Sequence, residues 1–296
     1  MIVFINGRFV PKEKAVVSVF DRGFLYGDGL FETIRVFHGH PFRWEQHLDR
    51  LRRGARLLKL EVPYSPGEMR LIAAHLIELN AQPESVLRIN VTRGVGPRGY
   101  STKSANSPTL VLSLHPAPPS QTKPTAWRLV TSRLRLAAGP LAQWKTANRL
   151  VQIMARMEAD AAQTDEALLL NANDEVVECS SANLFWARGR EVFTAPVEAG
   201  ALEGVTRQVV FEACRKLKVP CRERTTKLAA LKATDGVFAT LSTLGIVEIS
   251  EIDGAKLKRS SVVRKLHNAY WRMVMDETWG NLVRSPGFSR PRVAIK

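Results

Sequence analysis

The chain has 296 residues, with 43 Lys or Arg and 28 Asp or Glu, which gives a formal net charge of +15. Hydrophobic residues make up 45 % and charged residues 24 %, which excludes wholesale disorder and suits a chain with a substantial core. No apolar run approaches the roughly 20 residues of a membrane span, and we expect neither a signal peptide nor a membrane partner. The three cysteines form no Cys-x-x-Cys pair, which favours a reduced, cytoplasmic protein.

The positive charge is concentrated in one part of the chain. Residues 85–157 contain eleven Lys or Arg residues and no Asp or Glu. Such a field attracts anions, either nucleic acid or a phosphorylated cofactor with an acidic substrate. The same stretch holds only three aromatic residues and no recognisable nucleic-acid-binding module. We therefore expect no nucleic acid. The stretch either binds a small anionic partner or is a basic surface that only keeps the protein in solution.

The first half of the chain has clear turn and helix signals. Asn6-Gly7 between two apolar runs predicts a type I′ hairpin turn. Ser65, Pro66 and Glu68 predict a helix start, because Ser65 and Glu68 can form a capping box and proline suits the first helical position. The expected elements are hairpins over residues 2–10 and 33–44, helices over 45–60 and 65–79, and strands over 85–93 and 109–115.

A proline-rich segment separates this half from the rest. Residues 115–124 contain four prolines, which is typical of a stiff connector. We therefore predict an N-terminal domain over residues 1–117, a linker over 118–125 and a C-terminal domain over 126–280. Residues 281–296 contain four basic and no acidic residues and predict a loose basic tail.

The second half is expected to combine short, largely antiparallel strands with two helices. The pattern of residues 145–162 predicts a helix with an apolar face towards the core, formed by Leu150, Ile153, Met154, Met157 and Ala161. The other expected elements are strands over residues 127–132, 166–170, 175–179, 183–187, 191–194 and 236–240, and a helix over 206–217. The predicted fold class is α+β, with two α+β halves.

Residues 94–99 match the G-x-G-x-x-G pattern of dinucleotide-binding loops without its context. A dinucleotide site needs a following helix and an acidic residue about 20 positions on, whereas the next acidic residue here is Glu158. We instead predict a mobile loop that carries Arg98 and Tyr100. The planar guanidinium of Arg98 could bind a carboxylate in a bidentate manner.

Four other positions have both a structural and a chemical interpretation. Lys145 is either a solvated charge or a lysine of lowered pKa suited to Schiff-base chemistry. Glu178 is either an edge-strand residue facing water or the partner of a pyridinium nitrogen. Thr206 is either a helix cap or part of a phosphate site at a helix N-terminus, and Thr240 begins a similar hydroxyl-rich turn. The histidine spacing predicts no metal site.

Five segments in chain order resemble the class IV aminotransferases, the fold-type IV enzymes that use pyridoxal 5′-phosphate (PLP). These segments are residues 21–36 (DRGFLYGDGLFETIRV), 47–51 (HLDRL), 145–150 (KTANRL), 165–185 and 202–207 (LEGVTR). The match extends in order over residues 1 to about 275. The resemblance implies a two-domain fold like that of D-amino-acid aminotransferase, with the cofactor between the domains and usually a homodimer.

The resemblance also implies roles for individual residues. Lys145 would be the Schiff-base lysine and proton carrier, and Glu178 the partner of the pyridine nitrogen. The implied cofactor contacts are Arg50, Lys145, Glu178, Asn183, Val205, Thr206, Thr240 and Leu241. Thr33 would be catalytic, and the implied substrate contacts are Phe31, Arg98 and Tyr100. Arg50 lies off the apolar stripe of its predicted helix, so local reasoning alone would make it a solvated side chain.

The reaction is predicted less sharply than the cofactor. Residues 93–102 and 182–186 look most like the 4-amino-4-deoxychorismate lyases, in which Thr33 matches a catalytic threonine. Glu32 looks transaminase-like, and Arg98 also matches a carboxylate-binding arginine of D-amino-acid transaminases. We favour a lyase that releases pyruvate and 4-aminobenzoate. The alternative is transamination of D-amino acids, branched-chain amino acids or R-amines with a 2-oxo acid.

Overall fold

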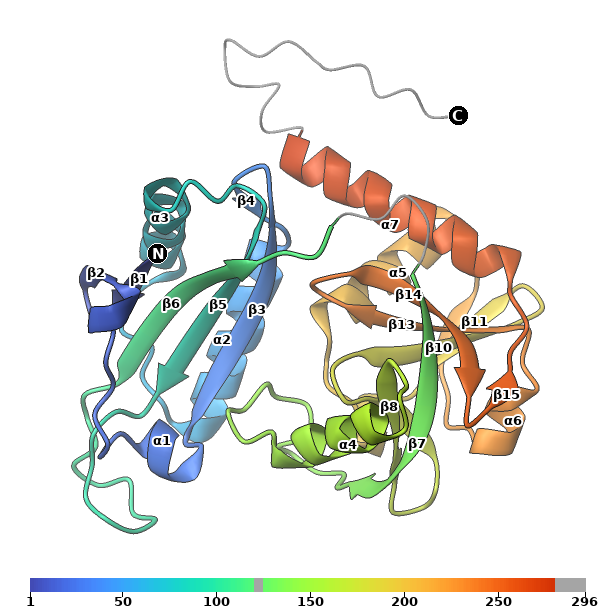
Figure 1. Cartoon of the computed structure of the whole chain (residues 1–296), viewed down its shortest axis with the longest axis horizontal. Helices are drawn as coiled ribbons and strands as arrows, with labels where there is room; N and C mark the ends of the chain where they lie inside the picture. The colour runs from blue at the N-terminus through green and yellow to red at the C-terminus, as the bar shows by residue number, and fades with distance from the viewer. Residues whose placement is uncertain (120–124, 280–296) are drawn as a thin grey trace.

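The computed structural model describes residues 1–119 and 125–279. It contains two β-sheets that lie side by side, each with its own helices (Figure 1). The first sheet ends at Pro116 and the second begins at Ala126. Most of the expected linker, and the whole of the expected basic tail, lie outside the described residues.

The first sheet has six antiparallel strands in the order β2-β1-β6-β5-β3-β4. Asn6 and Gly7 have φ values of 44° and 87°, as the predicted hairpin turn requires. In the second predicted hairpin, the returning strand has only two residues, because a helix already begins at Trp44. The strands are β1 (Ile2–Ile5), β2 (Arg8–Pro11), β3 (Gly29–Phe37), β4 (His40–Pro41), β5 (Ser85–Thr92) and β6 (Thr109–Pro116).

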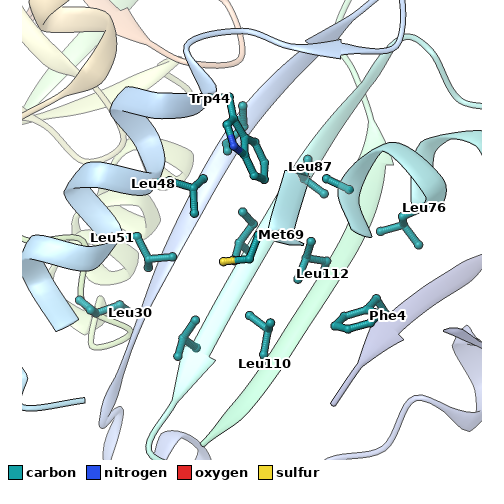
Figure 2. Packing of buried hydrophobic residues seen from close by; sticks show 14 of the residues in the cluster. Phe4, Leu30, Trp44, Leu48, Leu51, Met69, Leu76, Leu87, Leu110 and Leu112 are labelled. Carbon is teal, nitrogen blue, oxygen red and sulfur yellow. The ribbon is translucent and has the colours of Figure 1, made fainter. Parts of the chain in front are cut away.

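Two long helices, α2 (Trp44–Leu58) and α3 (Pro66–Leu79), pack on this sheet, and a short α1 (Arg22–Tyr26) precedes β3. The start of α3 is as predicted, since Ser65 and Glu68 form the capping box. Figure 2 shows the buried core of this half, with Met69 among side chains of the helices and the sheet. The described chain between β5 and β6 contains no helix, in agreement with the rejected dinucleotide site.

The second sheet has the order β12-β11-β10-β13-β14-β7-β8-β9, and β15 pairs with β14. Because β9 also pairs with β10, six of its strands close into a ring. Most pairs are antiparallel, whereas β7–β8, β7–β14 and β11–β12 are parallel. The strands are β7 (Ala126–Leu136), β8 (Glu166–Asn171), β9 (Val176–Cys179), β10 (Asn183–Arg188), β11 (Glu191–Thr194), β12 (Cys221–Glu223), β13 (Gly236–Leu241), β14 (Gly245–Ile252) and β15 (Ala255–Lys256).

The described part of the second half contains four α-helices: α4 (Leu150–Ala161), α5 (Val205–Lys216), α6 (Leu228–Lys232) and α7 (Ser261–Trp279). The sequence did not predict β14 or α7. Helix α7 lies along the second half and its end approaches the β3–β4 hairpin (Figure 1). Phe37 and Phe42 of that hairpin share a buried cluster with Tyr270 of α7 and with residues of α5. The Arg43 guanidinium also pairs with Glu212 at 2.7 Å, so the two halves are joined by both apolar and ionic contacts.

Helix α4 differs from the helix expected over residues 145–162. It begins only at Leu150, and its buried residues are Ala155 and Ala159, whose small side chains allow the helix to approach β7 and β8 closely. The stripe expected to face the core therefore faces outward. Its four larger residues, Leu150, Ile153, Met154 and Met157, are 45–64 % exposed.

Candidate active site

A cavity of about 370 Å³ lies between the two halves and is lined by residues of both. It brings together ten of the twelve predicted site residues. These are Phe31, Thr33, Arg50, Lys145, Glu178, Asn183, Val205, Thr206, Thr240 and Leu241. Residues from distant parts of the sequence therefore meet at one place, as a shared ligand site requires.

The other two predicted residues, Arg98 and Tyr100, do not line this cavity. Both are exposed, and Tyr100 is 89 % exposed. Two hydrogen bonds attach their loop to α1. The Arg22 guanidinium donates to the Gly99 carbonyl at 2.8 Å, and the Tyr26 hydroxyl accepts from the Gly99 N–H at 2.9 Å. Within one chain, the structure does not bring the loop to the cavity, and its contact with substrate stays a prediction.

The main chain around Lys145 is fixed by the first sheet. The Phe31 N–H donates to the Lys145 carbonyl at 2.9 Å, and the Ala147 N–H donates to the Gly29 carbonyl at 2.8 Å. The Lys145 amine reaches into the cavity and lies 4.6 Å from the centre of the Phe31 ring. Burial, with the positive charges of Arg50 and Arg149, lowers the pKa of Lys145 to about 7. This is not the environment of a solvated surface lysine.

Glu178 is buried on β9, so the alternative of an edge residue facing water is wrong. Its strand is covered because β9 pairs with β8 on one side and with Asn183 of β10 on the other. The Oε2 atom accepts hydrogen bonds from the Asn183 side-chain amide and the Leu202 N–H, both at 2.9 Å. Burial raises the pKa of Glu178 to about 7, although the Leu202 N–H and nearby cations oppose this.

The N-terminus of α5 also faces the cavity, next to Asn183 and therefore close to Glu178. Its N-cap is Gly204, and no side chain caps the helix, so the interpretation of Thr206 as the cap is wrong. The first N–H groups of a helix have no acceptor within the helix and can bind an anion. A Cβ atom on Gly204 would lie 1.9 Å from the Asn183 Oδ1 atom, so only glycine fits this approach. The Thr240 hydroxyl also faces the cavity, is buried and has no hydrogen-bond partner among the described residues.

Arg50 is buried in a charged network, contrary to the solvated side chain that local reasoning gave. Its guanidinium donates to both carboxylate oxygens of Glu32, at 2.6 and 2.7 Å, and to the Glu203 carbonyl at 2.9 Å. His47 lies 2.7 Å from the same carboxylate through Nδ1. Glu32 is completely buried, which alone would raise its pKa, but Arg50 and His47 hold that pKa at about 2.

Two arginines of the cavity, Arg88 and Arg149, were noted in the sequence only as part of the basic stretch. The Arg88 guanidinium carbon lies 3.6 Å from the centre of the Phe31 ring, and its Nη1 lies 3.4 Å from the Thr33 hydroxyl. Burial lowers the pKa of Arg88 to about 10. Within residues 1–119 and 125–279, neither arginine forms an ion pair with Asp or Glu, so both charges are available to a ligand. The sequence feature that could have indicated both arginines is the stretch of residues 85–157, which has no acidic residue and includes the predicted lysine.

A family model described as amino-transferase class IV matches residues 29–252 of the chain, which includes most of the cavity wall. The chain belongs to the class IV aminotransferases. The resemblance and the two-domain fold-type IV architecture that the sequence predicted are thereby confirmed. Class IV aminotransferases use PLP, and the protein is a PLP-dependent enzyme.

Similar proteins include both transaminases and lyases. A putative branched-chain-amino-acid aminotransferase of Methanocaldococcus jannaschii is 34 % identical over 263 residues, which cover 88 % of this chain and 91 % of that protein. The aminodeoxychorismate lyase of Bacillus subtilis is 28 % identical, and the match covers 96 % of this chain and 99 % of that protein. The crystal structure of a branched-chain aminotransferase from Thermoproteus uzoniensis has a TM-score of 0.88 at 29 % identity. That match covers 96 % of this chain and 97 % of the other.

In the described part of the enzyme, no group of three or more His, Cys, Asp or Glu residues is placed to hold a metal ion. No helix there has both the length and the apolar character needed to cross a membrane.

Proposed function

We propose that PLP binds in the 370 Å³ cavity with its phosphate at the N-terminus of α5. An anion there would accept from the free N–H groups of Val205 and Thr206 and from the unpartnered Thr240 hydroxyl. Arg50 adds a buried positive charge close to the start of α5, since it donates to the Glu203 carbonyl. Glu178, which also lines the cavity, would face the pyridine nitrogen. Its orientation is fixed by the two hydrogen bonds to its Oε2 atom.

The proposed roles of the protein groups follow from their protonation. PLP, when bound, supplies an aldehyde that bonds to amines and a ring that accepts negative charge. A lysine with a pKa near 7 is partly the free amine at neutral pH, so Lys145 can bond to the aldehyde and can later carry a proton from the substrate α-carbon. An ionised Glu178 keeps a proton on the ring nitrogen, which strengthens the ring as an acceptor of electrons.

We propose that the reaction is the release of pyruvate and 4-aminobenzoate from 4-amino-4-deoxychorismate. The observation that carries this choice is the Thr33 hydroxyl in the cavity beside two arginines that have no ion-pair partners among the described residues. The proposed substrate carries two carboxylates, which suit Arg88 and Arg149. The hydroxyl of Thr33 is placed to assist proton transfer during elimination. Transamination is the second candidate, and the buried Glu32 and the transaminase relatives favour it.

The Thr33→Val variant tests the lyase role, because valine keeps the shape of threonine and removes the hydroxyl. We expect 4-aminobenzoate release to fall about 10²-fold, which is typical for the loss of a group that assists proton transfer. The rate of half-transamination with amino acids should change much less. Thr225→Val, at an exposed position, is the matched control. Equal losses in both reactions would remove Thr33 from the elimination step.

The choice of reaction is decided by substrate panels given to the wild-type enzyme loaded with PLP. One panel contains 4-amino-4-deoxychorismate, and the other contains D- and L-amino acids and R-amines with 2-oxo acids. We expect 4-aminobenzoate and pyruvate from the first panel and only slow exchange in the second. Fast transamination without 4-aminobenzoate would overturn the lyase proposal and leave the proposed PLP site intact.

We further infer that the enzyme works as a homodimer. The outward face of α4 exposes four large apolar residues together, Leu150, Ile153, Met154 and Met157. Clustered exposed apolar side chains are typical of surfaces that bind another protein. A second copy would cover this face, as the family resemblance implies. The exposed loop with Arg98 and Tyr100 would then be free to reach a cavity of the partner, where its predicted contact with substrate could be made.

The Met154→Glu variant tests this interface. A charge placed in a dry interface costs about 3 kcal/mol or more, so the dissociation constant of the dimer should rise by roughly 10²-fold. Light scattering coupled to size-exclusion chromatography at low micromolar protein should show a dimer for the wild type and a monomer for the variant. Leu71→Glu is the control, because Leu71 on α3 is 74 % exposed and outside the proposed interface. A monomeric wild type would refute the inference.

A further inference from the structure

Arg149 immediately precedes α4 and lies four residues after Lys145. Its guanidinium spans the lysine segment, because Nη2 donates to the Trp144 carbonyl at 2.7 Å and Nε donates to the Thr146 carbonyl at 3.1 Å. These are the carbonyls of the two residues on either side of Lys145. The same side chain lines the cavity. One guanidinium therefore holds the main chain on both sides of the lysine. The guanidinium carbon and the lysine amine both lie over the Phe31 ring, 5.7 and 4.6 Å from its centre.

The charges that face the Lys145 amine come from several elements. Arg50 of α2 and Arg149 oppose a proton on the amine, whereas Glu32 of β3 and Glu178 of β9 favour one. The Arg50 charge is largely balanced by its two short hydrogen bonds to Glu32, which His47 also contacts. Among the residues that the structure describes, Arg149 has only main-chain carbonyls as hydrogen-bond acceptors. It forms no ion pair within the described residues, and Glu178 and Glu32 act on its charge only from a distance.

We propose that Arg149 is the positioning residue of Lys145. It holds the main chain on both sides of the lysine, and its positive charge keeps the lysine amine in the free-base form. A neighbouring cation destabilises the ammonium form, so its removal must raise the pH at which the amine loses its proton. The proposal deepens the proposed function, since it concerns the lysine that would bond to PLP. Its test needs neither PLP nor substrate.

The test measures the titration of Lys145 in the enzyme freed of PLP. Trace amounts of acetic anhydride label free amines at pH values from 5 to 10, and fragmentation mass spectrometry reports the labelling of residue 145. We expect a midpoint near pH 7 in the wild type. In Arg149→Met the midpoint should rise by about one pH unit, which leaves about tenfold less free amine at acid pH. Arg149→Gln should show the same shift while it keeps an amide donor for one carbonyl.

Two further variants separate charge from structure. Arg149→Lys keeps the charge, so the Lys145 midpoint should stay near that of the wild type. Arg156→Met is the matched control, because Arg156 lies on the same helix, pairs with Asp160 and has a side chain that is 48 % exposed. Its Lys145 midpoint should not change. Circular dichroism and thermal unfolding confirm that each variant is folded before it is labelled.

The outcomes are distinct. An unchanged midpoint in both Arg149→Met and Arg149→Gln overturns the proposal, and so does faster labelling at all pH values without a shift, which is the result expected of a purely structural clamp. An equal shift in Arg156→Met also overturns it. A different experiment tests the proposed PLP site. If that site is wrong, borohydride will attach no cofactor to Lys145 of the wild-type enzyme. The titration of the lysine can still be measured in that case.

Discussion

Replacing Lys145 with alanine should reduce turnover by about 10³-fold or more and should remove the site at which borohydride attaches the cofactor. The amine is the only lysine nitrogen that the described cavity wall contains, and it would act both as the bonding group and as the proton carrier. The loss of a group with both functions exceeds the loss of a single proton-transfer residue. Mass spectrometry of the borohydride-treated protein checks the adduct. Turnover is measured with whichever substrate the wild-type enzyme uses in the two substrate panels.

Lys216→Ala is the control for this variant, because Lys216 is an exposed lysine at the end of α5. It should keep both the adduct at Lys145 and the turnover of the wild type. An adduct found on another lysine of the wild-type enzyme would show that the cofactor bonds elsewhere. The assignment of the cavity would then be wrong, whatever the reaction.

Replacing Glu178 with glutamine should leave the cofactor bound and lower turnover by about 10²-fold, which is typical when a preorganised charge is removed from a reacting centre. The glutamine oxygen can still accept from Asn183 and from the Leu202 N–H, so the side chain should keep its place. A neutral amide cannot hold a proton on the pyridine nitrogen by charge. The ring would then accept electrons less well.

The visible absorption band of the bound cofactor and the turnover number measure the two effects separately. Glu191→Gln on β11 is the control, because Glu191 pairs with exposed Arg222 outside the cavity. Turnover close to that of the wild type in Glu178→Gln would place this carboxylate away from the pyridine nitrogen. Complete loss of the cofactor would instead assign it a role in binding.

Local chemistry explains which elements could be predicted from the sequence. The hairpin turn at Asn6-Gly7 and the capping box of Ser65 and Glu68 depend on residues close in sequence, and the structure contains both. The family resemblance predicted ten of the residues that line the cavity, because its segments are recognised one by one along the sequence. Glu178 stood out because an acidic residue within an apolar strand requires a partner.

The errors concern contacts between residues far apart in sequence. The stripe of α4 was assigned to the core because apolar spacing does not distinguish a protein interior from a surface that another chain could cover. The burial of Arg50 depends on Glu32, which lies 18 residues away on β3. The pairing of β9 with β10 buries Glu178 in the wall of the cavity. No local pattern specifies these pairings.

The burial of Phe37 and Phe42 between α5 and α7 has a consequence for how ligands reach the cavity. A hairpin of the first half is inserted into the core of the second, and Arg43 adds ion pairs to Glu212 and Glu277. Separating the halves would expose these rings and break those pairs. We therefore expect the two halves not to hinge apart when a ligand binds. Ligands would then enter and leave through local movements of side chains and loops at the mouth of the cavity, and the two halves should melt in a single transition.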